Sequence, residues 1–304
     1  MIRIKINDLQ LSAAAEAHFH AVCAYISSRK PDFQEEVYGK ICDIMPYGKS
    51  FEECKAENDW RWLRQFILAD VKALRSMIQY PGLLQFRQFK DLYSRCFCAG
   101  AAKYVDEEAK YNAYSFIENM GVKICPYCEE EYLDVIEKSE GGKLRTLELD
   151  HFFPKGDYPG LAMCFYNLVP SGQACNGIKL NNMLGMSPYE ADIEACTKLY
   201  PDLPLGVNMD SVAVDDCTIK FHPTKGMKKN VEVLCLEQRY ERHKPKAHRY
   251  LRNKQCYSDD KLDEMIRMGW LASREQAYQF LYDLDISGDN PELLDKLKRD
   301  ILNM

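Results

Sequence analysis

One stretch of the chain, from Cys125 to Lys179, limits what the protein can fold into, because it combines three short patterns that serve one another chemically. The patterns read CPYC, LELDHFFPK and YNLVPSGQACNGIK, in that order. Two cysteines separated by two residues have the spacing of a zinc half-site. An Asp-His dipeptide at the end of a strand can face a phosphate, and an Asn followed three residues later by a Lys can open a helix at the same point. We therefore expect the three segments to fold together around metal chemistry.

The order Asp150-His151, Asn167, Asn176 and Lys179 resembles the HNH nuclease motif, also called the ββα-metal finger. The preceding Cys-x-x-Cys strengthens the resemblance, since many HNH proteins carry a zinc knuckle around the motif. The sequence LDHFFPKGDYPGLA, followed by NLVPS, further resembles HNH nucleases of bacterial restriction and anti-phage modules, such as the Septu nuclease subunit. The resemblance covers the 55 residues of this stretch.

This resemblance implies a metal-dependent endonuclease that cleaves DNA by a one-metal mechanism and leaves 3′-hydroxyl and 5′-phosphate ends. It also suggests a role in anti-phage defence together with an ATPase. The chain itself has no GxxxxGKS or GxxxxGKT motif, so an ATPase partner would be a separate subunit.

Phosphodiester hydrolysis needs a base for the attacking water and a positive charge that stabilises the phosphate and the leaving oxygen. We assign His151 as the base and expect a backbone carbonyl on its other ring nitrogen to fix the tautomer. Asp150 and Asn176 are the predicted ligands of one catalytic ion, and their hard oxygens favour Mg²⁺ or Mn²⁺. Since strand neighbours face opposite sides, Asp150 and His151 can share a site only where the strand ends with a twist. Alternatively, His151 is a satisfied core histidine and Asn176 caps a helix.

Three other polar residues are predicted to support this site. Asn167 is expected to brace the loop between the finger strands through its side-chain amide. Lys179 lies one helical turn after Asn176, so both point from one helix face, and we predict that it contacts phosphate. Lys155 is a similar candidate. The alternative for both lysines is a solvated side chain without a specific role.

Cys125, Cys128 and Cys175 are the predicted ligands of a structural zinc ion. In the pattern that the resemblance implies, a second Cys-x-x-Cys precedes the catalytic Asn, but Gly172 stands at its first position. Closed structural zinc sites have four ligands, so three explanations stay open. Zinc binds with water or an external ligand, the cysteines pack without metal, or a distant residue completes the site. The candidates for that fourth ligand are Cys164, Cys98 and His222.

Composition sets outer limits on function. The 304 residues can form one large domain or two to three smaller ones. With no apolar run of about 18 residues and no signal-peptide pattern, we expect a cytoplasmic chain without a membrane span, whose 13 cysteines are mostly reduced. The net charge of −6 counts against a wholly basic nucleic-acid binder. Basic charge gathers at 222–254, where ten Lys or Arg accompany three Glu, and this segment is either a phosphate-binding surface or a solvated helical face.

The predicted fold class is α+β and mostly helical, with an HNH finger inserted between an N-terminal helical region and a mixed, mostly helical C-terminal region. The three regions are 1–105, 106–187 and 188–304. Apolar periodicity predicts N-terminal helices at 9–27, 51–79, 83–98 and 106–120. In the finger, we expect strands at 132–136, 143–152 and 167–170 and a helix at 174–184. Beyond it, we expect a helix at 189–200, strands at 211–221 and 231–236, and a largely helical segment at 239–254.

Two other functions fit the same residues. Spacing does not separate DNA from structured RNA, so an RNA-directed or toxin-like HNH nuclease is one alternative. The other is a catalytically inactive zinc-knuckle protein that binds nucleic acid or assembles with other proteins. The complete set of Asp150, His151 and Asn176 argues against the inactive alternative, because inactivity would most simply appear as the loss of one of them.

Overall fold

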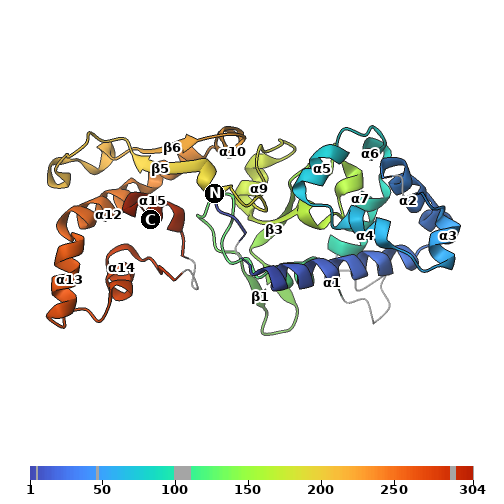
Figure 1. Ribbon diagram of the computed structural model, residues 1–304, viewed down its shortest axis with the longest axis horizontal. Coiled ribbons are helices and arrows are strands. Elements are labelled where there is room, and N and C mark those ends of the chain that lie inside the picture. Colours follow the sequence, from blue (N-terminus) through green and yellow to red (C-terminus); the bar gives the residue numbers. More distant parts are fainter. Residues whose placement is uncertain (5, 46–47, 99–110, 288–291, 304) are drawn as a thin grey trace. The chain divides into compact units, whose positions relative to one another are not determined.

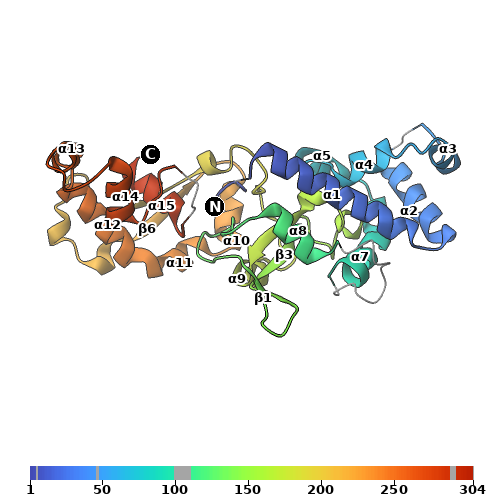
Figure 2. The same ribbon diagram turned by 90° about the horizontal axis from the view of Figure 1, so that it is seen from below.

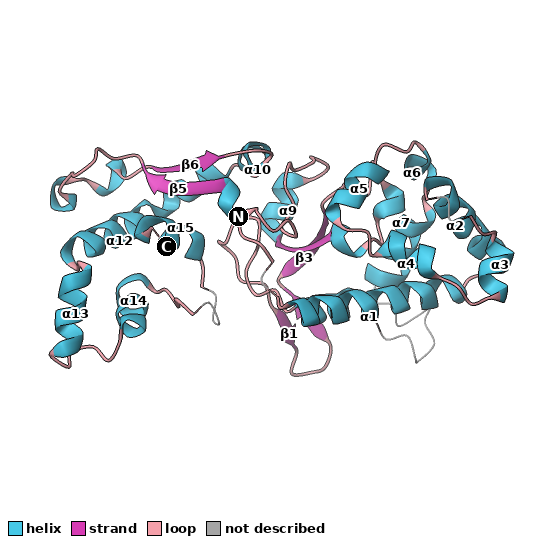
Figure 3. Ribbon diagram, in the orientation of Figure 1, coloured by secondary structure: helices cyan, strands magenta, loops and turns pink. Residues whose placement is uncertain are grey.

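The computed structural model describes all residues except 5, 46–47, 99–110, 288–291 and 304 (Figure 1). The fold is α+β and mostly helical, which confirms the predicted class, and the described strands form two-stranded antiparallel sheets (Figure 3). The chain divides into two compact units. The N-terminal unit comprises Ile4–Val122 and Leu133–Met183, and the C-terminal unit comprises Met1–Arg3, Lys123–Tyr132 and Leu184–Met304.

The two units are defined by which residues pack together. The three regions predicted from the sequence were instead drawn from motifs and composition, so the two divisions describe different things. The division into three regions therefore stays a prediction. None of the described helices combines the length and the apolar character needed to cross a bilayer.

Helices make up most of the N-terminal unit. The α-helices are α1 (Asp8–Ser27), α2 (Pro31–Ile44), α3 (Phe51–Ala56), α4 (Arg61–Ile67), α5 (Val71–Met77), α6 (Gly82–Gln85), α7 (Gln88–Leu92), α8 (Ala113–Met120) and α9 (Gln173–Lys179). A π-helix, η1 (Tyr93–Cys98), and two 3₁₀-helices, η2 (Pro159–Leu161) and η3 (Phe165–Asn167), accompany them. The strands are β1 (Val135–Glu137), β2 (Lys143–Arg145), β3 (Leu147–His151) and β4 (Leu168–Gly172).

The long helix α1 forms where the sequence predicts it. Its first turn is capped by Asn7, whose side chain accepts a hydrogen bond from the backbone of Gln10. One face, which includes His18, Val22 and Ile26, is buried, and the helix packs against α2 and α8. The start of the helix predicted at 106–120 lies outside the described residues, and the described part begins at Ala113.

The single helix predicted at 51–79 is wrong, because this segment contains three helices, α3, α4 and α5. The side chain of Ser50 caps α3, and that of Asp70 caps α5 by accepting a hydrogen bond from the backbone of Ala73. Asn58, between α3 and α4, has φ of 50°, which a continuous helix does not allow. The helix predicted at 83–98 is likewise divided into α6, α7 and η1.

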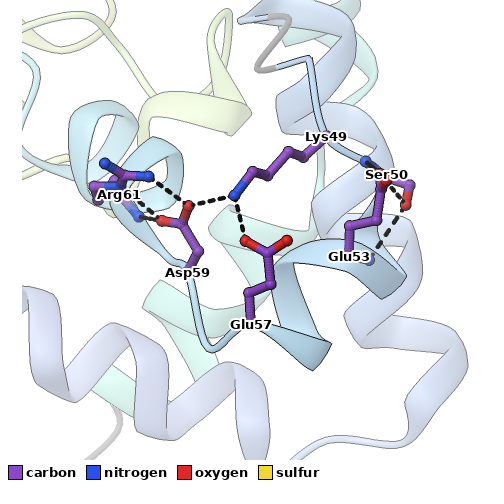
Figure 4. A network of polar contacts seen from close by, with 6 residues as sticks. All are labelled: Lys49, Ser50, Glu53, Glu57, Asp59 and Arg61. Carbon is purple, nitrogen blue, oxygen red and sulfur yellow. Dashed lines mark hydrogen bonds and ion pairs between the residues drawn. The ribbon is translucent and has the colours of Figure 1, made fainter.

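Polar contacts fix the connection between α3 and α4 (Figure 4). The ammonium of Lys49 lies 2.5 Å from a carboxylate oxygen of Glu57 and 3.0 Å from one of Asp59. Arg61, the first residue of α4, bonds both oxygens of Asp59 at 2.9 and 2.8 Å. The shared carboxylate thereby ties the loop to both helices.

Strands β3 and β4 form the antiparallel pair that carries the Asp-His dipeptide. Asp150 pairs with Val169, and His151, the last residue of β3, pairs with Leu168. Helix α9 follows directly after β4 and packs against both strands (Figures 1 and 2). This strand–strand–helix order brings Asn176 and Lys179 to the end of β3. The strand predicted at 143–152 is in fact two strands, and its first part, β2, forms a hairpin with β1 across Gly141-Gly142.

The C-terminal unit contains one sheet and a set of helices. The strands are β5 (Thr197–Pro201) and β6 (Ile219–Pro223), and the helices are α10 (Met227–Val233), α11 (Leu236–Tyr240), α12 (Lys244–Cys256), α13 (Asp259–Arg267), α14 (Arg274–Tyr282) and α15 (Asp295–Leu302). The 3₁₀-helices are η4 (Glu194–Cys196), η5 (Met209–Ser211), η6 (Val214–Asp216) and η7 (Glu241–His243).

Three predictions for this unit are wrong. The strand predicted at 211–221 contains η6 instead, and β6 begins only at Ile219. The helix predicted at 189–200 is replaced by η4 and β5, since Thr197 and Leu199 turn into the core while Lys198 and Tyr200 stay exposed in a strand pattern. The strand predicted at 231–236 instead spans the end of α10 and the start of α11. The helical basic segment is confirmed, and its Pro245 lies in the first turn of α12, where a proline is tolerated.

Candidate active site

A pocket of about 530 Å³ opens at the end of β3 in the N-terminal unit. Asp150, His151 and Asn176, which the sequence predicts to act together, all line it. Lys155 lines the same pocket. Its wall is completed by Tyr93, Ser94, Cys98, Glu148, Leu149, Pro154, Leu180 and Asn181. Residues from β3, from the following loop, from α9 and from the remote η1 thus converge on one hollow.

The strand ends at His151, and this end lets two consecutive residues line the same pocket. The backbone N–H of Phe152 donates to the carbonyl of Asn167 at 2.9 Å and closes the last rung beyond β3. The buried side chain of Asn167 then holds the turn, accepting a hydrogen bond from the N–H of Phe153 at 2.7 Å. It also donates to the carbonyls of Phe153 and Leu161 at 3.2 and 2.9 Å. Asn167 therefore makes bracing contacts of the kind predicted from the sequence.

His151 is buried, with its ring nitrogen Nε2 3.2 Å from the carbonyl oxygen of Ala162. A carbonyl can only accept, so Nε2 carries the proton and Nδ1 keeps its lone pair. The expected carbonyl partner is thus confirmed, and it fixes the tautomer. Burial, followed by the positive charge of Lys155, lowers the pKa of His151 to about 3, against the opposing effect of the Ala162 bond. The imidazole is therefore neutral at physiological pH.

The ring of Tyr93 supports two of the pocket's side chains. It meets the imidazole of His151 edge-on, with 4.4 Å between ring centroids. The ammonium of Lys155 lies over the same ring, 4.4 Å from its centroid, which is a cation–π geometry. Burial lowers the pKa of Lys155. A partly desolvated ammonium at the wall of a pocket is suited to an anionic ligand such as phosphate.

Lys179 differs from its prediction as a phosphate contact. Its side chain is fully buried, and its ammonium lies 3.0 Å from Oδ1 of Asp150. It also donates to the backbone carbonyl of His151 at 2.7 Å. A buried ammonium that is engaged by a carboxylate and a carbonyl does not reach a phosphate in the pocket. The structure thus corrects the predicted role, because Lys179 binds the end of β3 instead.

Asn176 lies in the middle of α9, half-buried and on the pocket wall. The N-cap of α9 is Gly172, so the alternative that Asn176 caps the helix is wrong. Its backbone carbonyl accepts from the N–H of Leu180 at 3.1 Å as the helix ends. The side-chain amide, one turn before Lys179, is therefore presented to the same pocket as Asp150.

Sequence reasoning missed several pocket residues. Glu148 lies two positions before Asp150 on β3, and a period of two predicts that both face the same side, so strand alternation could have identified it. Tyr93 lies in η1, far away in sequence, and no local spacing connects it with the Asp-His dipeptide. Leu180 has φ of 48° and a 69% exposed side chain, a combination that sequence does not predict.

The cysteines predicted to bind zinc are divided between the two units. Cys125 and Cys128 belong to the C-terminal unit and Cys175 to the N-terminal unit, and all three are buried, so a zinc site made of the three stays a prediction. Around the Cys-x-x-Cys turn, the N–H of Cys125 donates to the carbonyl of Glu131, and the N–H of Glu129 donates to the carbonyl of Cys125. These bonds fold the turn that brings the two cysteines of the half-site together.

Each candidate for a fourth zinc ligand has contacts of its own within its unit. Cys164 lies 3.5 Å from the carbonyl of Phe66 in the core, Cys98 lines the pocket, and the ring of His222 packs on Tyr200. The identity of a fourth zinc ligand therefore stays a prediction.

The basic segment 222–254 is largely compensated by carboxylates. Seven of its ten lysines and arginines form ion pairs; they are Lys225, Lys228, Arg239, Arg242, Lys244, Arg249 and Arg252. Glu130, which is nearly buried, contacts Arg239, Arg242 and His243 at 2.7, 3.4 and 2.9 Å. Several partners come from outside the segment, so the excess positive charge counted in the sequence overstates what the surface presents.

A scan of protein-family models, a search of curated proteins and a search of solved structures found no match to this chain. The chemistry of the pocket is therefore the basis on which a function can be argued.

Proposed function

We propose that this protein is a metal-dependent HNH endonuclease that hydrolyses phosphodiester bonds in DNA. The observation that carries the proposal is the shared pocket of Asp150, His151 and Asn176, with the histidine tautomer fixed by the carbonyl of Ala162. A carboxylate, an amide and a neutral imidazole on one wall supply the two things that hydrolysis needs, oxygen ligands for a cation and a base for water.

The role of His151 follows from its environment. Because Nε2 donates to Ala162, Nδ1 is the nitrogen that can accept a proton from the attacking water. Burial and the charge of Lys155 keep the pKa of the ring low, so the base is in its neutral form before the reaction. The contact with Tyr93 and the Asn167 brace limit the motion of the ring and of the strand end. The imidazole is then oriented before substrate arrives.

Asp150 and Asn176 would hold the catalytic ion, and their hard oxygen donors fit Mg²⁺ or Mn²⁺. When bound, such an ion would supply a Lewis acid beside the phosphate. Lys155, half-buried over Tyr93, is placed to contact a phosphate oxygen at the pocket wall. The resemblance of this segment to HNH nucleases of anti-phage modules supports a role in defence, with an ATPase supplied by another chain.

We also propose a structural role for metal at the Cys-x-x-Cys turn. Cys125 and Cys128, which are buried in this turn, have the spacing of a zinc half-site, and Cys175 is the third ligand predicted from the sequence.

A plasmid assay tests the proposal. We expect purified protein with Mg²⁺ or Mn²⁺ to nick or cut supercoiled DNA, and His151→Ala to lower the rate by about 100-fold or more while the protein stays folded. His20→Ala, at an exposed histidine of α1, is the matched control and should cleave like the wild type. Equal rates for His151→Ala and the wild type would refute the assigned base. Cleavage of structured RNA but not DNA under the same conditions would replace the substrate class.

A further inference from the structure

The lysine nearest to the proposed metal site is not on the pocket surface but beneath it. The ammonium of Lys179 is fully buried between Oδ1 of Asp150, at 3.0 Å, and the backbone oxygen of His151, at 2.7 Å. It thereby contacts the side chain of one proposed catalytic residue and the main chain of the next. Asn176, the other proposed ligand, lies one turn earlier on the same helix, α9.

In the protein without metal, the ammonium of Lys179 offsets the cost of burying the carboxylate of Asp150. Asp150 is only 3% exposed, and a carboxylate so far from water is costly unless a cation or several donors compensate it. A divalent ion would provide that compensation when bound, but it would then lie close to a second, permanently buried positive charge. Charges of like sign a few ångströms apart repel each other strongly in a poorly solvated region. Metal and lysine therefore stabilise the same carboxylate but repel each other.

Building on the proposed function, we propose that Lys179 is the internal counter-cation of the catalytic site, which holds Asp150 in place without metal and sets how weakly the pocket binds its divalent ion. The lysine is a positioning residue and does not contact substrate. Its second bond, to the carbonyl of His151, links the backbone of the proposed base to α9. One ammonium thus holds Asp150 and His151 in fixed positions relative to each other.

Calorimetric titration with Mn²⁺ alone tests the inference. We expect Lys179→Met to bind Mn²⁺ at least about tenfold more tightly than the wild type, because the competing charge is gone. Lys72→Met, which removes an exposed charge from α5 of the same unit, should bind like the wild type. Lys179→Arg, which keeps the charge, should retain weak binding. Unchanged or weaker binding by Lys179→Met would overturn the inference.

A further variant separates this inference from the proposed function. Asp150→Asn should abolish Mn²⁺ binding in the pocket; if it leaves wild-type binding intact, the proposed ligand set fails, whatever Lys179 does. If Asp150→Asn removes binding but Lys179→Met does not tighten it, only the counter-cation role fails.

The melting temperature, Tm, is a second measurement, and it also tests the inference if Lys179→Met is less stable than the wild type. Without metal, Lys179→Met should melt lower than the wild type, because the buried carboxylate of Asp150 loses the ammonium beside it, and Mn²⁺ should raise its Tm more than that of the wild type. The double variant Asp150→Asn with Lys179→Met should recover part of the lost Tm, because it buries no unpaired charge. Additive losses in the double variant would contradict the pairing, since a merely structural lysine would give them.

Discussion

The side chain of Asn167 and the backbone of Phe153 form a closed pair of hydrogen bonds, in which the side-chain oxygen accepts at 2.7 Å and the amide nitrogen donates at 3.2 Å. A third bond runs to the carbonyl of Leu161. Because Asn167 is fully buried, its removal takes these partners from the N–H and the C=O of Phe153 without giving them access to water, whereas the carbonyl of Leu161 keeps the hydrogen bond from the N–H of Cys164.

We predict that Asn167→Ala lowers the free energy of unfolding by about 2–4 kcal/mol, as expected when buried polar groups lose their partners. Urea denaturation of the purified protein measures the change. Asn182→Ala, at an exposed position after α9, is the control and should alter the stability by no more than about 0.5 kcal/mol. A similarly small effect of Asn167→Ala would show that the brace contributes little.

The stability should also depend on pH through His18. This histidine is fully buried in α1, where Nε2 donates to the carbonyl of Met163 at 2.9 Å, and burial lowers its pKa from 6.5 to about 4. The unfolded chain therefore binds a proton at His18 between pH 6.5 and 4 that the folded chain does not. The contribution is fully present above pH 6.5 and is lost as the pH falls toward 4, by up to about 3 kcal/mol.

Denaturation midpoints measured from pH 7.5 down to 4.5 for the wild type and for His18→Gln should reveal this contribution. The wild type should lose stability more steeply than the variant over that interval. His20→Gln, two positions along the same helix but exposed, should follow the wild-type slope. Parallel curves for the wild type and His18→Gln would contradict a buried neutral imidazole at His18.

Two glycines of the C-terminal unit lie in backbone contact. A Cβ atom on Gly185 would fall 2.1 Å from the carbonyl oxygen of Gly226, and a Cβ atom on Gly226 would fall 2.8 Å from that of Gly185. Both obstacles are backbone and cannot rotate away. We predict that Gly185→Ala costs about 2–3 kcal/mol of stability, the range for an overpacked interior. Gly39→Ala in α2, where nothing lies within 4 Å, should be neutral or slightly stabilising in the same chemical denaturation experiment.

The Cys-x-x-Cys turn predicts bound zinc. Elemental analysis of protein purified without chelator should find about one zinc per chain, and Cys128→Ser should lower that content, because the half-site loses one thiolate. Cys256→Ser, at an exposed cysteine outside the turn, should leave the content unchanged. A folded, active preparation without zinc would remove the structural metal from the proposal.

The parts of the fold that sequence predicted well are those set by local patterns. The Asp-His strand end, the second strand and α9 follow from residues that are neighbours in the chain, and α1 follows from its apolar periodicity and its cap. That a backbone carbonyl fixes the tautomer of His151 was also predictable, because a histidine that acts as a base needs a partner on its other nitrogen. Which carbonyl it is was not.

Predictions failed where distant residues decide the structure. The segment before Tyr200 contains good helix formers, but its pairing with β6, about 20 residues later, converts Thr197–Pro201 into a strand. The apolar run at 231–236 fits a strand or a buried helix equally well, and Cys235, with φ of 52°, separates two helices there. Spacing placed Lys179 on the face of Asn176 but could not reveal that this face is buried against β3.

The strand–strand–helix segment has one more consequence. The proposed base, oxygen donors and counter-cation all lie between Asp150 and Lys179, a stretch of 30 consecutive residues. Such a cassette could move between host proteins by a single insertion, with its internal contacts preserved. The aromatic ring on which the imidazole rests comes from the surrounding helices, so each new host would have to provide its own equivalent of Tyr93.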